Sequence, residues 1–198
     1  MPKIVDVEER KKRIAEATWQ VIVEKGMEGA TVRNIAEQAG LSLGALRHYF
    51  SNQDELLAYA MDLVMENVGR RVEAVLTENL PLPELVLKVL LQVVPVEEQT
   101  LLEMEVWFAF ITHLKHKKQK SAPFDALMDG MKKIVAELDR QNLLKEGLNI
   151  DIETERLYAV LDGLAIHALF EPERLNRERV TKTLAYHLNS LLKPEHSI

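Results

Sequence analysis

Residues 36–57, AEQAGLSLGALRHYFSNQDELL, hold three adjacent side chains whose polar ends suit contact with nucleic acid. Arg47 can donate two hydrogen bonds to the edge of a guanine. His48 and Tyr49 can each bind a phosphate or a base edge. The alternative is that Tyr49 belongs partly to a core and that His48 is an ordinary surface residue.

These side chains need a short helix that presents them to solvent. Leu46 and Phe50 are four residues apart, so both lie on one face of such a helix. If that face is buried, the opposite face points to solvent. There the small residues Gly44 and Ala45 would let the backbone approach DNA closely, and the Ala45 methyl could meet a thymine methyl. The side chains then expected to point outward are Leu43, Gly44, Ala45, Arg47, His48 and Tyr49.

The residues before this helix predict a helix-turn-helix. Ala36 is small enough for two helices to approach closely, Gly40 permits the positive φ of a tight turn, and Leu46 fills the angle between the helices. Thr31 and Ser42 are expected to cap the two helices. With Arg33, the free N–H groups at these helix starts could hold phosphates.

The remainder of the chain is also helical in pattern, with no clear strand alternation. We therefore expect an all-α fold of about nine helices. Residues 1–52 would form a three-helix, helix-turn-helix DNA-binding domain, and residues 53–198 a ligand-binding and dimerisation domain of five to six helices. The expected helices are residues 7–25, 32–39, 43–49, 53–76, 83–94, 97–115, 123–144, 152–170 and 177–192.

Composition limits the possible classes. The net charge is −6, and the first 60 residues hold eight Lys or Arg against nine Asp or Glu, so a DNA reader would need a local basic patch. Cysteine is absent, which excludes disulfides and thiolate metal sites. Neither a signal peptide nor an apolar run long enough to span a membrane is evident, so a cytoplasmic location is expected.

Two common catalytic motifs are also absent from the sequence. It has no Gly-rich phosphate loop and no H-E-x-x-H. His113 and His116 are three residues apart, but no third ligand stands in register, so neither a metal site nor a cofactor is expected. The alternative to a DNA reader is an all-helical small-molecule carrier or hydrolase in which the helix-turn-helix is only scaffold.

Residues 31–57, TVRNIAEQAGLSLGALRHYFSNQDELL, closely resemble the signature of the tetracycline-repressor-like (TetR) family. The resemblance implies a homodimeric bacterial transcriptional regulator, usually a repressor that a small-molecule effector releases from double-stranded operator DNA. Many members have lysine at the start of the fourth helix, where Gln53 keeps a donor but adds no charge. The implied DNA contacts are Thr31, Arg33, Ser42, Leu43, Gly44, Ala45, Arg47, His48, Tyr49 and Gln53.

The resemblance also places an effector pocket among the later helices. Residues 101–110, LLEMEVWFAF, are similar to a helix of the choline-sensing branch, and acids beside Trp107 would suit a cationic effector held by cation–π contact. A hydrophobic effector such as a fatty acid or an aromatic drug is expected at least as strongly. The candidate lining residues are Met61, Met65, Glu103, Trp107, Phe110, His113, Met128, Met131, Tyr158, Asp162 and His167.

The last two expected helices carry apolar stripes that need cover. The helix expected at residues 152–170 is apolar nearly all round, and such a helix packs against neighbours on more than one side. We expect these helices to pair with those of a second copy in a four-helix dimer interface, and the alternative is a core within one chain. The expected interface residues are Leu157, Leu161, Leu164, Ala168, Val180, Leu184, Leu188 and Leu191.

Overall fold

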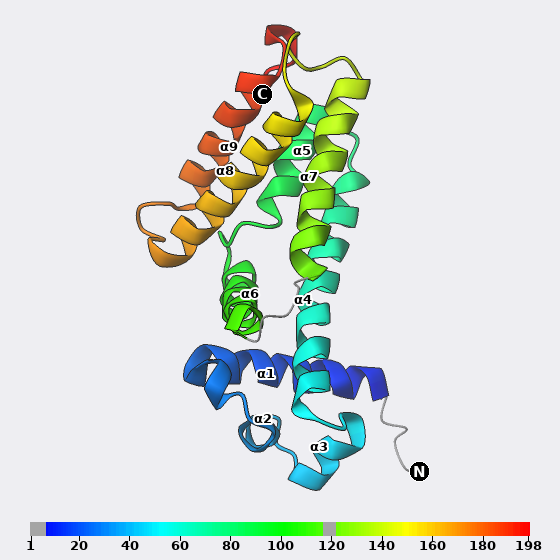
Figure 1. Ribbon diagram of the computed structural model, residues 1–198, viewed down its shortest axis with the longest axis vertical. Coiled ribbons are helices and arrows are strands. Elements are labelled where there is room, and N and C mark those ends of the chain that lie inside the picture. The colour runs from blue at the N-terminus through cyan, green and yellow to red at the C-terminus, as the bar shows by residue number, and fades with distance from the viewer. Residues whose placement is uncertain (1–6, 117–121) are drawn as a thin grey trace. The chain divides into compact units, whose positions relative to one another are not determined.

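The computed structural model describes residues 7–116 and 122–198, and these residues form nine α-helices, one short 3-10 helix and no strand (Figure 1). The expected all-α fold is therefore confirmed. None of the described helices combines the length and the apolar composition that a membrane span requires. The elements are α1 Val7–Gly29, α2 Val32–Gln38, α3 Leu43–Tyr49, α4 Gln53–Leu76, α5 Leu82–Leu91, α6 Glu98–His116, α7 Ala122–Arg140, α8 Ile150–Phe170, α9 Arg177–Leu191 and the 3-10 helix η1 Pro194–His196.

The chain packs into two compact units. The first comprises Met1–Asn67 and Glu105–Lys120, and the second comprises Val68–Met104 and Ser121–Ile198. Helices α4 and α6 are each divided between the two units. The compact units therefore do not coincide with the division expected after residue 52, because the first part of α4 packs with the N-terminal helices.

The core of the first unit is formed by α1, α2, α3 and the first part of α4. The side chains of Ile14, Ile35 and Leu56 are fully buried. Burying an aliphatic side chain of this size stabilises a fold by about 1.5–3 kcal/mol. Trp19 on α1 also donates a hydrogen bond from Nε1 to the carbonyl oxygen of Ala60 on α4, at 2.9 Å. This core holds the short helices α2 and α3 against the longer helices α1 and α4.

Two glycines set the chain direction in the first unit. Gly26 has a φ of 69°, which ends the regular run of α1, and a further helical turn continues to Gly29. Gly40 has a φ of 64° between α2 and α3. Both positions have the positive φ that favours glycine, and Gly40 is where the sequence predicted a tight turn.

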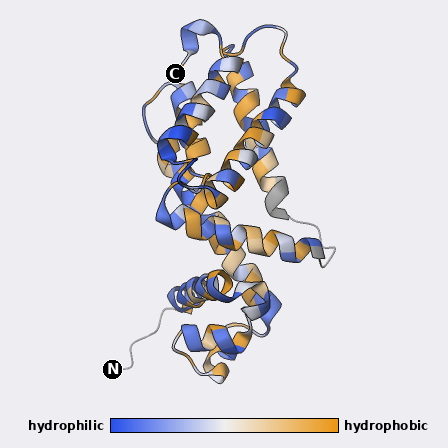
Figure 2. Cartoon of the chain, turned by 90° about the vertical axis from the view of Figure 1, so that its left-hand side faces the viewer, coloured by the Kyte–Doolittle hydropathy of each residue, from blue (hydrophilic) through white to orange (hydrophobic). Residues whose placement is uncertain are grey.

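The core of the second unit is formed by α5, α7, α8 and α9, and α8 and α9 lie side by side (Figure 1). Hydrophilic and hydrophobic residues alternate along most of the helices, as Figure 2 shows, so most helices offer an apolar stripe to their neighbours. Fully buried members of this core include Leu90, Val135, Leu138 and Val180.

Two expected helices end three or more residues earlier than predicted. The helix expected to reach residue 144 ends at Arg140, because Asn142 adopts a φ of 57° and leaves the helical path. The next residues then pair with the end of α9: Lys193 N–H donates to the carbonyl oxygen of Leu143, and Lys145 N–H donates to that of Leu191, each at 2.9 Å. Helix α5 likewise ends at Leu91 rather than at residue 94.

Candidate nucleic-acid interface

Side-chain hydroxyls cap the two short helices, as the sequence predicted. The backbone N–H of Asn34 donates to Thr31 Oγ1 at 3.2 Å, and that of Ala45 donates to Ser42 Oγ at 3.1 Å. Thr31 and Ser42 are both exposed. Because each hydroxyl oxygen acts as the acceptor in its cap, its own proton stays available to a phosphate.

The turn between α2 and α3 is tight and held by backbone hydrogen bonds. The N–H of Leu41 donates to the carbonyl oxygen of Ala36 at 2.8 Å, and that of Gly40 donates to Glu37 at 3.1 Å. Ala36 is buried where the two helices approach. This is the helix-turn-helix that the spacing predicted.

Helix α3 buries one face and exposes the other. Leu46 is 1% and Phe50 is 2% exposed, whereas Leu43 is 40% exposed. Gly44, Arg47 and His48 are exposed, and Ala45 and Tyr49 are half-buried. The rings of His48 and Tyr49 meet edge to face, with centroids 5.4 Å apart. The expected orientation of α3 is therefore confirmed, and the alternative for Tyr49 holds in part because its ring is half-covered.

The two arginines of this surface are exposed and available. Neither Arg33 nor Arg47 forms an ion pair or a side-chain hydrogen bond with another residue that the structure describes. A guanidinium without an internal partner can place its donors on an outside acceptor at no cost of a broken contact. The two residues can therefore contact a phosphate and a base edge without any internal rearrangement.

Gln53 at the start of α4 is used within the first unit. Its Nε2 donates to the carbonyl oxygen of Ala30 at 2.9 Å, and its side chain is half-buried. Asn52 caps α4, since the N–H of Glu55 donates to Asn52 Oδ1 at 2.8 Å. Hydrogen bonds from Ser51 lower the pKa of Glu55 and keep its carboxylate charged. The start of α4 thus carries acidic charge rather than the basic charge common in the resembling family.

The residues expected to line an effector pocket are divided between the two units. The side chain of His116, three residues after His113, lies outside the described part of the structure, as do residues 117–121. Among the described residues, no group of three or more His, Asp or Glu is placed to hold a metal ion. The first unit contains Met61, Met65, Trp107, Phe110 and His113, and the second contains Glu103, Met128, Met131, Tyr158, Asp162 and His167.

Glu103 forms an ion pair with Arg71. Arg71 donates from Nη1 to one carboxylate oxygen at 3.1 Å and from Nη2 to the other at 2.7 Å. The Glu103 side chain is 4% exposed. A carboxylate that is already paired and buried offers no net charge to a cationic ligand, so Glu103 does not supply the free acid that the sequence suggested beside Trp107.

Tyr158 and Asp162 form a half-buried polar pair on α8. The Tyr158 hydroxyl is buried and has no hydrogen-bond partner among the described residues. Burial, and then the charges of Asp162 and Glu155, raise the pKa of Tyr158 to about 12. Burial likewise raises the pKa of Asp162. His167 differs from both, because it is exposed and its Nδ1 lies 3.2 Å from Glu171 on the surface.

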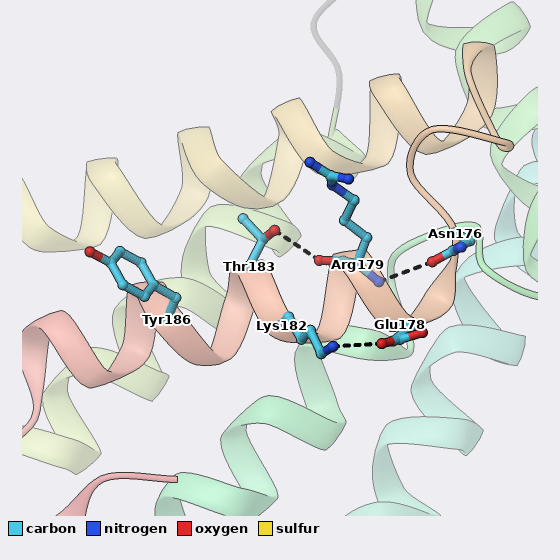
Figure 3. Close-up of a pocket in the computed structure, with 6 residues that line it drawn as sticks. All are labelled: Asn176, Glu178, Arg179, Lys182, Thr183 and Tyr186. Carbon is cyan, nitrogen blue, oxygen red and sulfur yellow. Dashed lines mark hydrogen bonds and ion pairs between the residues drawn. The ribbon is translucent and has the colours of Figure 1, made fainter.

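The second unit has an open groove of about 470 Å³ on α9 (Figure 3). Lys182 and Glu178 face one another on its wall, and Tyr186 is 81% exposed. No residue that the sequence predicted for the effector pocket lines this groove. Its lining residues are Asn176, Glu178, Arg179, Lys182, Thr183 and Tyr186.

The stripe expected to form a dimer interface is the inner face of α8 and α9. All eight of its residues are at most 8% exposed and belong to the core of the second unit. The structure therefore places this stripe in the core of one chain, and its role in contact with a second copy stays a prediction. The residues concerned are Leu157, Leu161, Leu164, Ala168, Val180, Leu184, Leu188 and Leu191.

Comparisons with known proteins match both parts of the chain. Residues 14–60 match the family of bacterial regulatory proteins called tetR, and residues 83–193 match the C-terminal domain of BetI-type transcriptional repressors. The HTH-type transcriptional regulator PksA of Bacillus subtilis (strain 168) is 53% identical over 192 residues, 96% of this chain and 94% of the relative. The regulator BetI of Escherichia coli (strain K12) is 26% identical over 189 residues, 90% and 92% of the two chains.

Solved structures share the fold. A putative transcriptional regulator from Saccharomonospora viridis in complex with choline superposes with a TM-score of 0.79 at 19% identity, covering 94% of this chain and 99% of that one. SmeT, the repressor of the multidrug efflux pump SmeDEF of Stenotrophomonas maltophilia, gives 0.73 at 21% identity, covering 95% and 93%. The family match over more than half of the chain and the helix-turn-helix geometry lead to one conclusion: the chain belongs to the tetR family of bacterial regulatory proteins, with a C-terminal domain of the BetI type.

Proposed function

We propose that the protein is a homodimeric transcriptional repressor that binds operator DNA through α3 and is released by a small-molecule effector. The observation that carries this proposal is the outer face of α3. It exposes Arg47 and His48 on a helix whose opposite face is fully buried. A short rigid helix of this kind fits the major groove, where donors can distinguish base pairs.

The contacts divide into two kinds. Arg47 would donate to a guanine edge, with Gly44 and Ala45 permitting the close approach. Thr31 and Ser42 would hold phosphates through the helix starts and their hydroxyl protons, and Arg33 would add a charge. His48, Tyr49 and Leu43 would complete the surface. Base contacts then set the operator sequence, and phosphate contacts set orientation.

Dimerisation would use outward faces of the second unit. Apolar side chains remain strongly exposed on α8 and α9: Ile152 at 60%, Phe170 at 66% and Tyr186 at 81%. Aromatic side chains such as those of Phe170 and Tyr186 are enriched at protein interfaces. A second copy packed on them would give the two-fold symmetry by which two α3 helices meet half-sites about 34–36 Å apart.

The effector would be hydrophobic or cationic. The C-terminal match to BetI-type repressors and the choline bound by the Saccharomonospora viridis protein favour a small quaternary ammonium compound. Since Glu103 is paired with Arg71, Asp162 and the unpartnered hydroxyl of Tyr158 are the polar groups that such a ligand would engage. Choline added to the purified protein should raise its melting temperature, and Asp162→Asn should reduce that shift.

The central experiment is selection of binding fragments from the source genome with purified protein, followed by titration of the enriched duplex. Arg47→Ala should lose sequence-selective binding, by about 1–3 kcal/mol if it reads one base pair. Arg140→Ala on α7, an exposed arginine of the second unit, is the matched control. If no duplex is enriched over random DNA, or if Arg47→Ala binds the selected duplex like wild type, the proposed reader is wrong.

A further inference from the structure

We infer that the ion pair between Arg71 and Glu103 is the joint that transmits regulation between the two units. This inference rests on the proposed function, since it concerns how a DNA-bound first unit and an effector-bound second unit influence each other. Arg71 lies on α4 and Glu103 lies on α6, the two described helices that are divided between the units.

The position of the pair along both helices is the first argument. The division in α4 falls between Asn67 and Val68, and the division in α6 falls between Met104 and Glu105. Arg71 and Glu103 therefore stand on the second-unit side of both divisions, close to where each helix leaves that unit. A bond at this place therefore holds together the two helices, α4 and α6, that continue into the first unit.

The contacts converge from three segments. Both Nη atoms of Arg71 donate to the two oxygens of Glu103, at 3.1 and 2.7 Å, in a fork geometry that fixes orientation as well as distance. Arg71 Nη2 also donates to the carbonyl oxygen of Gln92 at the end of α5, at 3.3 Å. Gln99 Nε2 donates to Glu103 Oε1 at 3.4 Å. The ion pair thus ties α4, the end of α5 and α6 together.

Burial makes separation of this ion pair unfavourable. The side chain of Glu103 is 4% exposed and that of Arg71 is 23% exposed. Separating a buried carboxylate from the guanidinium that pairs with it is strongly unfavourable. Helices α4 and α6 are therefore expected to shift together while the pair is intact, and to shift independently once it is broken.

A neighbouring residue makes α4 pliable at the same place. Gly69 lies in the helix interior between the division and Arg71, and a Cβ built there meets no atom within 4 Å. Glycine weakens a helix interior because it lacks side-chain restriction of the backbone. The ion pair thus anchors α4 two residues beyond the one glycine of this helix, which is where we expect a hinge to form.

Hydrogen–deuterium exchange of the full chain, with and without the selected operator duplex, tests the joint. DNA binding to wild type should slow exchange in the first unit and also change it over residues 92–104 of the second. In Glu103→Gln the change over residues 92–104 should be lost, while the operator still protects α3. Glu78→Gln is the matched control, because it breaks an exposed ion pair with Lys88 in the same unit.

A double variant guards against misfolding of the single one. Arg71→Met with Glu103→Leu removes both charges, which often preserves stability, and should lose the distant change as Glu103→Gln does. If either variant keeps the wild-type exchange change over residues 92–104, or if wild type binds the operator without any such change, the joint is refuted. A wild type that binds no duplex would refute the proposed function itself, and the inference with it.

Discussion

Gln53 and Ala30 are joined by a hydrogen bond of 2.9 Å from the glutamine Nε2 to the alanine carbonyl oxygen. This contact links the start of α4 to the turn before α2, so it positions the helix-turn-helix on its support. It also occupies the side chain that would otherwise face DNA from the start of α4. The acids Asp54 and Glu55 follow directly and are exposed.

Gln53→Lys is therefore expected to strengthen DNA binding. A lysine here replaces an internal donor by a charge beside the DNA surface, and each added phosphate contact steepens the dependence of log K on log salt by about one. Titration of the selected operator at several salt concentrations measures the slope. Gln141→Lys, at an exposed site of the second unit, adds the same charge and should leave the slope unchanged. Equal slopes for the two variants would contradict the expectation that a side chain at position 53 can reach a phosphate.

Ser42→Asp separates the capping role of this residue from its DNA role. Aspartate caps helices as well as serine does, so the melting temperature should be maintained. Its charge would face the phosphates, and binding should weaken by about tenfold or more, equivalent to ~1.4 kcal/mol. Asn176→Asp makes the corresponding change at the cap of α9 and should bind DNA like wild type. A folded Ser42→Asp protein with normal affinity would show that Ser42 does not approach phosphate.

Local signals explain why α3 and α4 were predicted with their observed bounds. The caps at Ser42 and Asn52, the glycine turn and the four-residue spacing of Leu46 and Phe50 all act within a few residues of each other. The helix-turn-helix could therefore be predicted almost completely from the sequence, including which face of α3 points outward.

Contacts between distant segments explain what the sequence did not reveal. The end of α7 depends on pairing of Leu143 with Lys193, and the state of Glu103 depends on Arg71. An apolar stripe also has the same periodicity whether it faces its own chain or a second one. The stripe that includes Leu161 and Leu184 therefore fits a dimer interface and a core equally well by sequence, and in the structure it belongs to the core of one chain.

Gly69→Ala should stabilise the protein. Position 69 lies inside α4, its surroundings leave room for a methyl group, and alanine is favoured over glycine in a helix interior by about 1 kcal/mol. Urea unfolding followed by circular dichroism measures the change. The same substitution at Gly40, where φ is 64°, should instead destabilise the protein. A loss of stability in Gly69→Ala would mean that α4 is not regular at this point.

Tyr158→Phe should also stabilise the protein in the absence of effector. The hydroxyl is buried without a partner among the described residues, and such a group costs roughly 1–3 kcal/mol relative to one that is satisfied. Thermal melting of the variant should show a rise in midpoint. Tyr186→Phe, on an 81% exposed ring, should leave the midpoint unchanged. A lower midpoint for Tyr158→Phe would show that the hydroxyl has a partner that the described contacts omit.

His187 should make stability fall at mildly acidic pH. The residue is buried on α9, its Nε2 has no hydrogen-bond partner among the described residues, and burial followed by the charge of Arg156 lowers its pKa from 6.5. Below pH 6.5 the unfolded chain takes up a proton that the folded chain refuses, so the free energy of unfolding decreases as pH falls toward the folded pKa. Above pH 6.5 both states are neutral and the contribution is constant. Unfolding measured from pH 7.5 to 5 should therefore show a steeper decline in wild type than in His187→Gln, which has no titrating ring. Parallel curves for the two proteins would mean that the imidazole is protonated equally in the folded and unfolded states, and that α8 and α9 leave it open to water.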